Sequence, residues 1–584
     1  MTSPEKIHPG PHGPHTSVSV ALAGSGGAGV MTAGNMLLEA AARSGYYALM
    51  TRSSGPQIRG GEAAAMIRIA RDPIECMDDR FDVLVAVDWD NVHRFRAEIA
   101  LTADSLVIGD PDQGEPHEAF TGSGARYAPV HLKKMAKTIE GGRANMLALG
   151  LVAELLGLPE DAVMRAVEKT LGRRPGALEP SLAAMAAGRA AGADLEVEYG
   201  LAPPAAQSTS RWLVSGNEAT GLGALRGGVR FVAAYPITPA TELLEWMSPA
   251  LAEVGGALVQ AEDELASINM AIGSSYGGVP SLTATSGPGL SLMVEALGLA
   301  VTAETPVVVV NVMRVGPSTG IPTKSEQGDL NIALYGLHGD APHLVLAPNS
   351  VADCLCTAEW AVQLAESLQA PAIVLSDQFM GQARSVIDPP APSPAPARRL
   401  TAKPDSPDYR RYGLTDSGLS PMAIPGTPGV SYTADGLEHT ERGTPSSQAS
   451  DHLAQLQKRE RKLAHGDYAA HWADVEGDGE LAVITFGSCT GPVREAITRA
   501  REGGLAVRLV SMRLLSPAQP ARLAEALEGV NKLLVVEQTH SGQFLGYLRR
   551  EYDLAAELSS LRKPGVLQFH PDEIHRHLLA WSQT

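Results

Sequence analysis

The chain has 584 residues, 44% of them hydrophobic, and a formal net charge of -18. Its length predicts three or four domains, and its acidic balance argues against nucleic acid or an anionic membrane as the main partner. The four cysteines include no Cys-x-x-Cys pair, so we expect neither a disulfide framework nor a metal or iron–sulfur site held by this chain alone. The sequence shows no signal-peptide pattern and no run of roughly 18 apolar residues, so we predict a cytoplasmic protein without membrane helices.

The first predicted domain, residues 1–190, opens with a strand, a glycine-rich turn and a helix, which is the start of a doubly wound α/β domain. Gly24, Gly26 and Gly29 form a G-x-G-x-x-G pattern in the turn, where a helix N-terminus can face a phosphate. A nicotinamide nucleotide would need an acid at the end of the next strand, but YYALMTRSS carries Arg52 and no acid. The pattern favours another phosphate-bearing ligand, such as coenzyme A, over NAD. A turn that serves only packing is the alternative.

A second loop of this domain, GPQIRGGEA, holds Arg59 between a Gly-Pro and a Gly-Gly pair. Its guanidinium could present a fork of donors to an anion or to a carboxylate of another subunit. The alternative is an arginine that is only solvated. Residues 191–210 are interpreted as a linker to the next domain.

Residues 211–385 alternate short apolar strands with helical stretches, which indicates a parallel sheet buried on both faces. In YPITP, Thr238 lies between Pro236 and Pro239 on a stiff backbone, although a helix cap would also explain a threonine. Glu262, Asp263 and Glu264 begin a helix, where acids often serve only the helix dipole.

A third loop of the same domain, VNVMRVGPSTGIPTKSEQGDL, places Arg314 where a buried strand ends. Ligands of parallel α/β sheets bind at these carboxyl ends. With Lys324 and several hydroxyls nearby, the loop suits a carboxylate or a phosphate. The alternative is an ion pair of Arg314 with Glu326 or Asp329.

Residues 386–475 are Pro-rich and turn-rich, so we expect an extended linker that wraps a neighbour rather than folding alone. Residues 476–584 return to the α/β pattern. Two α/β domains flanking a linker are the plan of transketolase-like enzymes, although such an analogy proves no function.

Taken together, these strings resemble the 2-oxoacid:ferredoxin oxidoreductase family, in a form that fuses its gamma and alpha subunits, most like the 2-oxoglutarate enzymes. GSGGAGV with GPQIRGGEA resembles the gamma domain, and GNEATGLGALRGGVRFVAAYPITPAT the start of the pyrimidine domain. RVGPSTGIPTKSEQGDL resembles the substrate loop, and GSCTGPVREAI with VVEQTHSGQ the transketolase C-terminal domain. The resemblance implies an α/β fold of several doubly wound domains: a gamma Rossmann-like domain, a thiamine-diphosphate pyrimidine-type domain and a transketolase C-terminal-like domain.

The resemblance also implies roles for individual residues. A glutamate of the pyrimidine domain bonds N1′ of the aminopyrimidine and so activates thiamine diphosphate. Glu264 best matches that position, and Glu262 is the second choice. The residues that the family pattern assigns to oxoacid binding are Thr238, Arg314, Thr323 and Lys324. The residues that it assigns to cofactors are Tyr235, Pro236 and Ile237 beside thiamine diphosphate, and Gly26, Gly27 and Arg59 for coenzyme A or another subunit.

One departure from the family pattern concerns the diphosphate. The family motif is Gly-Asp-Gly followed at a distance by Asn, and Gly477-Asp478-Gly479 precedes a strand with Asn531 too far away, so we interpret it as a turn. A separate beta subunit is therefore expected to bring the diphosphate and Mg²⁺ site and at least one [4Fe–4S] cluster, in an (αβ)2 heterotetramer.

The assembled enzyme is expected to convert a 2-oxoacid, coenzyme A and oxidised ferredoxin into acyl-CoA, CO₂ and reduced ferredoxin, or the reverse, as in a reductive TCA cycle. Strings in the linker favour 2-oxoglutarate, whose second carboxylate needs an extra cation, for which Lys324, Arg410 and Arg411 are candidates. The alternatives are a subunit for pyruvate, branched-chain oxoacids or indolepyruvate, or a scaffold subunit without catalysis.

Overall fold

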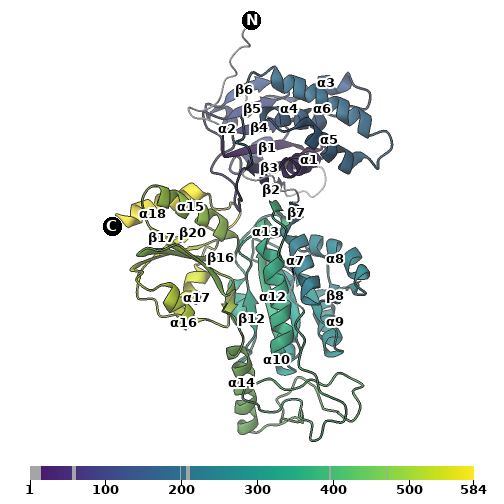
Figure 1. Ribbon diagram of the computed structural model, residues 1–584, viewed down its shortest axis with the longest axis vertical. Coiled ribbons are helices and arrows are strands. Elements are labelled where there is room, and N and C mark those ends of the chain that lie inside the picture. The colour runs from purple at the N-terminus through teal and green to yellow at the C-terminus, as the bar shows by residue number, and fades with distance from the viewer. Residues whose placement is uncertain are drawn as a thin grey trace. The chain divides into compact units, whose positions relative to one another are not determined.

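The structure, a computed structural model, describes residues 15–55, 61–197, 199–204, 211–392, 396–469 and 471–583. The chain divides into two compact units (Figure 1). The first comprises residues 1–214, 383–390 and 570–572, and the second comprises residues 215–382, 391–569 and 573–584. Each unit is built on α/β sheets, as the sequence predicts.

The first unit contains an eight-stranded sheet in the order β6-β5-β4-β1-β3-β2-β14-β7. Its strands are β1 (Ser17–Ser25), β2 (Tyr47–Ser54), β3 (Glu62–Ala70), β4 (Val83–Ala86), β5 (Leu106–Gly109), β6 (Arg126–Pro129), β7 (Trp212–Ser215) and β14 (Arg384–Ile387). Strands β1, β4, β5 and β6 run parallel, whereas β3 lies antiparallel between β1 and β2. The domain is α/β as predicted, and its sheet is mixed because β3 runs antiparallel.

Helices cover the sheet of the first unit because their apolar faces pack on its buried strands. They are α1 (Val30–Arg43), α2 (Glu118–Thr121), α3 (Leu132–Lys137), α4 (Ala144–Leu155), α5 (Glu160–Leu171) and α6 (Leu178–Ala193). Residues of α1, α4, α5 and the strands share one apolar core. A second, aromatic-rich core includes Phe81, Trp89, Phe95 and Phe120.

The second unit contains a seven-stranded sheet in the order β18-β12-β13-β11-β10-β8-β9. Its strands are β8 (Phe231–Ala234), β9 (Ala257–Gln260), β10 (Ser281–Thr285), β11 (Val307–Met313), β12 (Leu344–Leu346), β13 (Pro371–Asp377) and the antiparallel β18 (Leu514–Ser516). Its helices are α7 (Gly216–Gly227), α8 (Thr241–Glu253), α9 (Glu264–Tyr276), α10 (Gly287–Thr302), α11 (Leu330–Tyr335), α12 (Asp353–Leu368) and α13 (Gln378–Gln382). Strands β10, β11 and β13 are buried along their whole length, as expected for a sheet covered on both faces.

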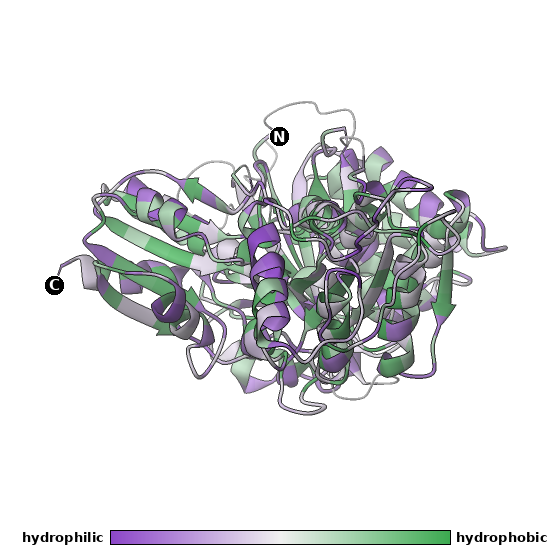
Figure 2. Cartoon of the chain, turned by 90° about the horizontal axis from the view of Figure 1, so that it is seen from below, coloured by the Kyte–Doolittle hydropathy of each residue, from purple (hydrophilic) through white to green (hydrophobic). Residues whose placement is uncertain are grey.

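The C-terminal part of this unit has its own five-stranded sheet in the order β15-β17-β16-β19-β20. Its strands are β15 (Ala473–Glu476), β16 (Leu481–Phe486), β17 (Val507–Met512), β19 (Lys532–Glu537) and β20 (Glu557–Arg562), and its helices are α15 (Thr490–Glu502), α16 (Pro520–Ala526), α17 (Gln543–Glu551) and α18 (Pro571–Ser582). Figure 2 shows green stretches in strands near the C-terminus, and apolar side chains of β16, β17 and β19 line both faces of the sheet. Gly477-Asp478-Gly479 lies in the connection between β15 and β16, where Gly477 and Gly479 adopt positive φ.

The linker between these two sheets is not extended throughout, because it contains the 16-residue helix α14 (Ala449–Ala464). Lys458 and Lys462 of this helix bring their ammonium groups to the buried carboxylate of Glu304, at distances of 2.6 and 3.2 Å. Arg411 is also fully buried and donates from Nη2 to the Glu304 carbonyl oxygen at 2.8 Å. These charged groups fasten the linker beside the C-terminal end of α10.

Candidate active site

The candidate residues of the second unit gather at one edge of the seven-stranded sheet. Strands β11, β10, β8 and β9 are neighbours and run parallel, so their carboxyl ends lie side by side. The loop after β11 carries Arg314, Ser286 after β10 leads into the first turn of α10, and the loop after β8 is YPITP. Residues 262–264 follow β9. The sheet topology thus brings together motifs that are up to 80 residues apart in the sequence, the setting in which α/β enzymes bind ligands.

The three acids after β9 occupy different environments. Asp263 is the N-cap of α9, because its Oδ1 accepts a 2.7 Å hydrogen bond from the N–H of Ala266. Glu262 is exposed to solvent. Glu264 is only 8% exposed, and it lies so close to the next turn that a Cβ on Gly289 would stand 2.8 Å from its Oε1. Within the described residues, the Glu264 carboxylate has no hydrogen bond and no ion pair.

The side chain of Glu264 therefore differs from its two neighbours, because it is largely buried and makes no hydrogen bond within the described residues. Side-chain capping and surface solvation explain Asp263 and Glu262, but neither explains Glu264. Position 289 requires glycine, because a Cβ there would collide first with the Thr285 hydroxyl and then with the Glu264 side chain. The arrangement leaves a carboxylate able to accept a hydrogen bond from a ligand.

Arg314 and the YPITP loop are joined directly. Nη1 of Arg314 donates a 2.7 Å hydrogen bond to the carbonyl oxygen of Thr238, which is half-buried. Arg314 is 7% exposed, and its buried Nε has no partner among the described residues. Burial lowers the pKa of Arg314 and the charge of Asp329 raises it, yet the two groups form no ion pair. In the described structure Arg314 therefore forms no ion pair with Glu326 or Asp329, the alternative that the sequence left open.

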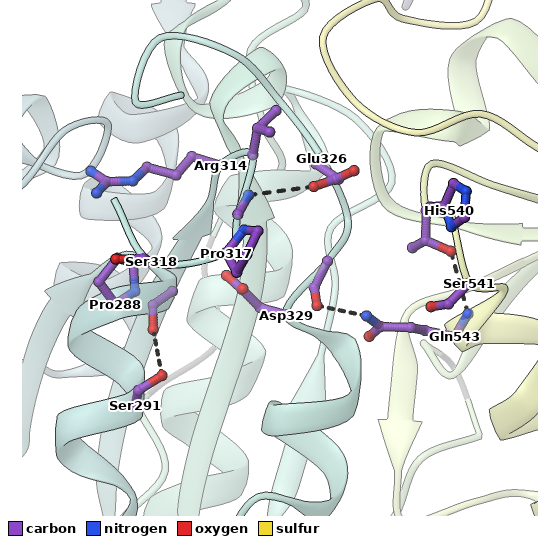
Figure 3. Close-up of a pocket in the computed structure, with 15 residues that line it drawn as sticks. Pro288, Ser291, Arg314, Pro317, Ser318, Glu326, Asp329, His540, Ser541 and Gln543 are labelled. Atoms are coloured by element: carbon purple, nitrogen blue, oxygen red, sulfur yellow. Dashed lines mark hydrogen bonds between the residues drawn. The ribbon is translucent and has the colours of Figure 1, made fainter. Parts of the chain in front are cut away.

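The remaining predicted residues of this region lie around that contact. Tyr235 is 40% exposed, whereas Pro236 and Ile237 are half-buried. Thr323 and Lys324 are half-buried in the loop that Arg314 begins, where the N–H of Lys324 donates to the carbonyl of Ile321 at 3.1 Å. Figure 3 shows that Arg314 points away from Glu326.

A cavity of about 690 Å³ opens beside this loop (Figure 3). Its lining residues come from the start of α10, from the loop after β11 and from the turn before α17: Gly287, Pro288, Ser291, Arg314, Val315, Gly316, Pro317, Ser318, Glu326, Gly328, Asp329, Thr539, His540, Ser541 and Gln543. Thr323, Lys324 and Glu264 do not line it. Burial raises the pKa of Asp329, and a 2.9 Å hydrogen bond from Nδ2 of Asn311 opposes that rise.

Sequence reasoning did not single out Asp329 as a site residue, nor His540 or Gln543. A signal existed, since the VVEQTHSGQ string that includes His540 and Gln543 was part of the family resemblance.

The structure corrects two of the candidate cations for the second carboxylate of 2-oxoglutarate, Arg410 and Arg411. Arg411 donates to backbone carbonyls at the C-terminal end of α10, about 24 Å along that helix from Gly287, and the exposed Arg410 pairs with Asp408 and Glu441.

The candidate coenzyme A residues belong to the first unit. Gly26 and Gly27 are exposed in the turn between β1 and α1. Position 27 favours glycine, because its φ of 94° is a backbone conformation that other residues rarely adopt. The carboxylate of Asp88 accepts hydrogen bonds from the N–H and hydroxyl of Ser25, at 2.9 and 2.7 Å. Arg59 lies outside the described residues.

Three family models match the chain. They are the thiamine diphosphate-binding domain of pyruvate flavodoxin/ferredoxin oxidoreductase at residues 222–458, the pyruvate ferredoxin/flavodoxin oxidoreductase domain at residues 19–191, and core domain II of pyruvate:ferredoxin oxidoreductase at residues 479–569. Each covers one of the sheet-containing regions described above, and the first also extends through the linker into α14.

Curated relatives and a solved structure agree with these matches. The chain is 34% identical to a 2-oxoglutarate oxidoreductase subunit KorA of Mycobacterium tuberculosis, over 97% of this chain and 91% of that one. It is 30% identical to the alpha subunit of a 2-oxoacid:ferredoxin oxidoreductase of Aeropyrum pernix, over 94% and 95%. A structure of 2-oxoglutarate:ferredoxin oxidoreductase from Magnetococcus marinus, with 2-oxoglutarate, coenzyme A and succinyl-CoA bound, aligns with a TM-score of 0.90 and 35% identity over 97% of this chain and 99% of that chain.

The fold and the matched models define an alpha-type subunit of a thiamine-diphosphate-dependent oxidoreductase. The chain belongs to the 2-oxoacid:ferredoxin oxidoreductase family. The expected family, its fold class and its enzymatic nature are thereby confirmed. Among the described residues, no helix combines the length and the apolar composition needed to cross a membrane.

Proposed function

We propose that this chain is the alpha-type subunit of a 2-oxoglutarate:ferredoxin oxidoreductase that uses coenzyme A. The overall reaction converts 2-oxoglutarate and coenzyme A into succinyl-CoA and CO₂, and two electrons pass to ferredoxin. The printed activities of the relatives and of the Magnetococcus marinus structure support this substrate. The observation that carries the proposal is the joint placement of Glu264 and of the Arg314–Thr238 contact at adjacent strand ends.

The residues present fit thiamine diphosphate, because Glu264 is a buried carboxylate with no partner in the described part of the chain. When bound, this cofactor supplies the carbanion that attacks the ketone and the electron sink for decarboxylation. Glu264 accepts a hydrogen bond from a ring nitrogen of the aminopyrimidine and so holds a proton there. Tyr235, Pro236 and Ile237 form the adjoining wall.

Oxoacid binding falls to the loop after β11. Arg314 offers a buried guanidinium whose Nε is unpaired in the described structure, and a carboxylate can accept from it in a charge-assisted pair. The hydrogen bond to Thr238 fixes the guanidinium plane. Thr323 and Lys324 then act on the rest of the substrate, with Lys324 facing the second carboxylate of 2-oxoglutarate.

A second subunit completes the site in this proposal. Exposed apolar side chains lie on α9, the helix that Glu264 begins, with Leu265 at 50% and Met270 at 44%, and on the adjoining α10, with Leu292 at 49%. Such a surface next to an unpaired carboxylate suits coverage by another protein. We assign the diphosphate, Mg²⁺ and [4Fe–4S] sites to a beta subunit in an (αβ)2 heterotetramer, because the four cysteines here make no cluster motif. Gly26, Gly27 and Arg59 of the gamma-type domain are proposed for coenzyme A.

The domain division also stays a proposal: residues 1–190, 211–385 and 476–584 as the three domains, with linkers at 191–210 and 386–475.

The function is tested by co-expressing the chain with its beta subunit and measuring kcat/KM for a panel of oxoacids with coenzyme A and a viologen acceptor. We expect 2-oxoglutarate to give the highest kcat/KM. A higher value for pyruvate, a branched-chain oxoacid or indolepyruvate would refute the assignment, and no turnover of any oxoacid would indicate a scaffold subunit.

A further inference from the structure

We propose that Gln543, which the C-terminal domain contributes, is a positioning residue for the loop that binds the oxoacid. This inference rests on the proposed function, because it assumes that the loop beginning at Arg314 holds the substrate. Gln543 is the first residue of α17, more than 200 positions away from that loop in the sequence. It touches the loop where it ends and α11 begins.

Gln543 makes two hydrogen bonds there. Its Nε2 donates to the carbonyl oxygen of Gly328 at 2.8 Å, and its Oε1 accepts from the N–H of Asn331 at 2.9 Å. The side-chain amide thus replaces, at one point, both a backbone donor and a backbone acceptor. These two bonds flank Asp329, which lines the same cavity as Arg314 (Figure 3). A single side chain therefore fixes the backbone on both sides of a cavity residue.

The turn that carries Gln543 is itself held rigidly. The fully buried Glu537 accepts a 2.7 Å hydrogen bond from the hydroxyl of Thr539 and bonds of 2.8 and 3.0 Å from the N–H groups of Phe544 and Leu545. The N–H of Gly542, whose φ is 77°, donates to the Thr539 hydroxyl at 3.0 Å. A buried carboxylate that accepts several backbone bonds keeps its turn in one conformation. The backbone from which the Gln543 side chain extends is therefore held in one conformation.

The neighbouring residues of the loop are anchored to the same domain. The N–H of Gln327 donates to the carbonyl of Gln538 at 3.0 Å, and the N–H of Gln538 donates to Oε1 of Gln327 at 2.8 Å. Glu326 accepts from the N–H of Gly565 at 2.9 Å and, at 3.4 Å, from the N–H of Gly316 at the start of the loop. The two ends of the loop are thus tied to one another and to the C-terminal domain. Glu326 and Gln543 both line the cavity, and Gln543 is the one of the two that belongs to the C-terminal domain.

This arrangement predicts a distinct effect on substrate binding. Gln543 acts through the loop, so its removal should loosen Arg314 without removing any group that touches the oxoacid. Each of its two hydrogen bonds is worth a factor of about five in an equilibrium constant. We expect Gln543→Leu and Gln543→Glu, assayed in the complex with the beta subunit, to raise the oxoacid KM about tenfold while kcat changes less than about threefold. Gln519→Leu, whose side chain bonds only Pro517 and Ala518 of its own turn, is the matched control and should leave KM unchanged.

Three comparisons decide the matter. If Arg314→Ala raises KM and the Gln543 variants do not, the inference fails and the proposed function stands. If Arg314→Ala leaves KM unchanged, the proposed function fails, and the inference falls with it. If the double variant Arg314→Ala/Gln543→Leu shows the KM of Arg314→Ala alone, Gln543 works through the loop, whereas multiplied effects would overturn that route.

Hydrogen exchange gives a readout that does not depend on turnover. In the Gln543→Leu complex, amides of residues 314–328 should exchange faster, while those of β16 and β19 should keep the protection of the unsubstituted chain. Protection in β16 and β19 shows that the fold is intact. Unchanged exchange in residues 314–328 would overturn the inference.

Discussion

Nη1 of Arg314 donates a 2.7 Å hydrogen bond to the carbonyl oxygen of Thr238, which joins the loop after β11 to the loop after β8. These strands are not hydrogen-bonded to each other, because β10 lies between them. The contact therefore bridges one strand at the carboxyl edge of the sheet, where the first turn of α10 contributes Gly289, whose neighbour is Glu264 at the start of α9. Substrate-binding and cofactor-activating groups are thus positioned by one framework.

Replacing Arg314 by Ala should raise the oxoacid KM strongly, by about a hundredfold. Loss of a charge-assisted contact in a buried site costs about 2–3 kcal/mol. Steady-state kinetics of the assembled enzyme measure the effect. Arg410→Ala is the matched control, since Arg410 is exposed and pairs with Asp408 and Glu441. An unchanged KM for Arg314→Ala would place the carboxylate site elsewhere.

Lys324 gives a prediction about substrate choice. If its ammonium faces the second carboxylate, Lys324→Met should lower kcat/KM for 2-oxoglutarate by about tenfold or more and leave 2-oxobutyrate nearly unaffected, because the latter lacks that carboxylate. The ratio of the two kcat/KM values is the measurement. A proportional loss with both substrates would show that Lys324 does not read the second carboxylate.

Much of the fold follows from patterns that the sequence displays. The apolar runs that predict strands at residues 305–313 and 370–377 become β11 and β13, both buried throughout. Strand β9 was not predicted, because its residues are largely exposed at the sheet edge and show no buried run. Helix α14 was missed for a related reason: its inward face uses Lys458 and Lys462, which look like surface residues until Glu304 is seen beside them.

The site was predictable where a motif sits at a strand end, as with Arg314 and Thr238. The family resemblance favoured Glu264 over Glu262, and the structure gives a physical difference between them: Glu262 is exposed before the Asp263 cap, whereas Glu264 is the buried first residue of α9. The contact of Gln543 with the substrate loop could not be predicted, because Gln543 and its partner Gly328 are 215 positions apart in the sequence. The order of β1, β3 and β2 also depends on long-range pairing, so the antiparallel β3 was not foreseen.

Glu304 provides a prediction about stability. Glu304→Gln should lower the free energy of unfolding by about 3–5 kcal/mol, because it leaves two buried ammonium groups without their counterion. Lys462→Met should cost less, since Lys458 still pairs with Glu304. Denaturant titration at pH 7 compares the two variants. A smaller loss for Glu304→Gln than for Lys462→Met would contradict the assigned role of the carboxylate.

The same cluster sets a pH dependence. Although burial opposes it, the charges of Lys462 and Lys458 hold the pKa of Glu304 well below its ordinary value of 4.5. A group with a lowered pKa in the folded state stabilises the protein above its ordinary pKa, and this contribution is lost as the pH falls through the lower folded value. Glu304→Gln should therefore flatten the acid limb of the stability curve below about pH 5. An acid limb as steep as that of the unsubstituted chain would show that other carboxylates determine it.

Purified without its partner, the chain should bind thiamine diphosphate weakly, because the proposed site contributes a carboxylate and a wall but no diphosphate motif. Isothermal titration calorimetry should show no binding at micromolar cofactor, and binding should appear when the beta subunit is added. Micromolar affinity of the isolated chain would mean that it carries a diphosphate site of its own.

The most direct test of the account compares Glu264→Gln with Glu262→Gln in the assembled enzyme, by single-turnover decarboxylation of 2-oxoglutarate. Both substitutions remove one negative charge from the same turn, but only Glu264 is buried beside Gly289. Glu264→Gln should slow the step at least about a hundredfold, equivalent to about 3 kcal/mol of activation free energy, while Glu262→Gln stays near the unsubstituted rate. A near-normal rate for Glu264→Gln, or a larger loss for Glu262→Gln, would contradict the assignment of Glu264 as the activating carboxylate.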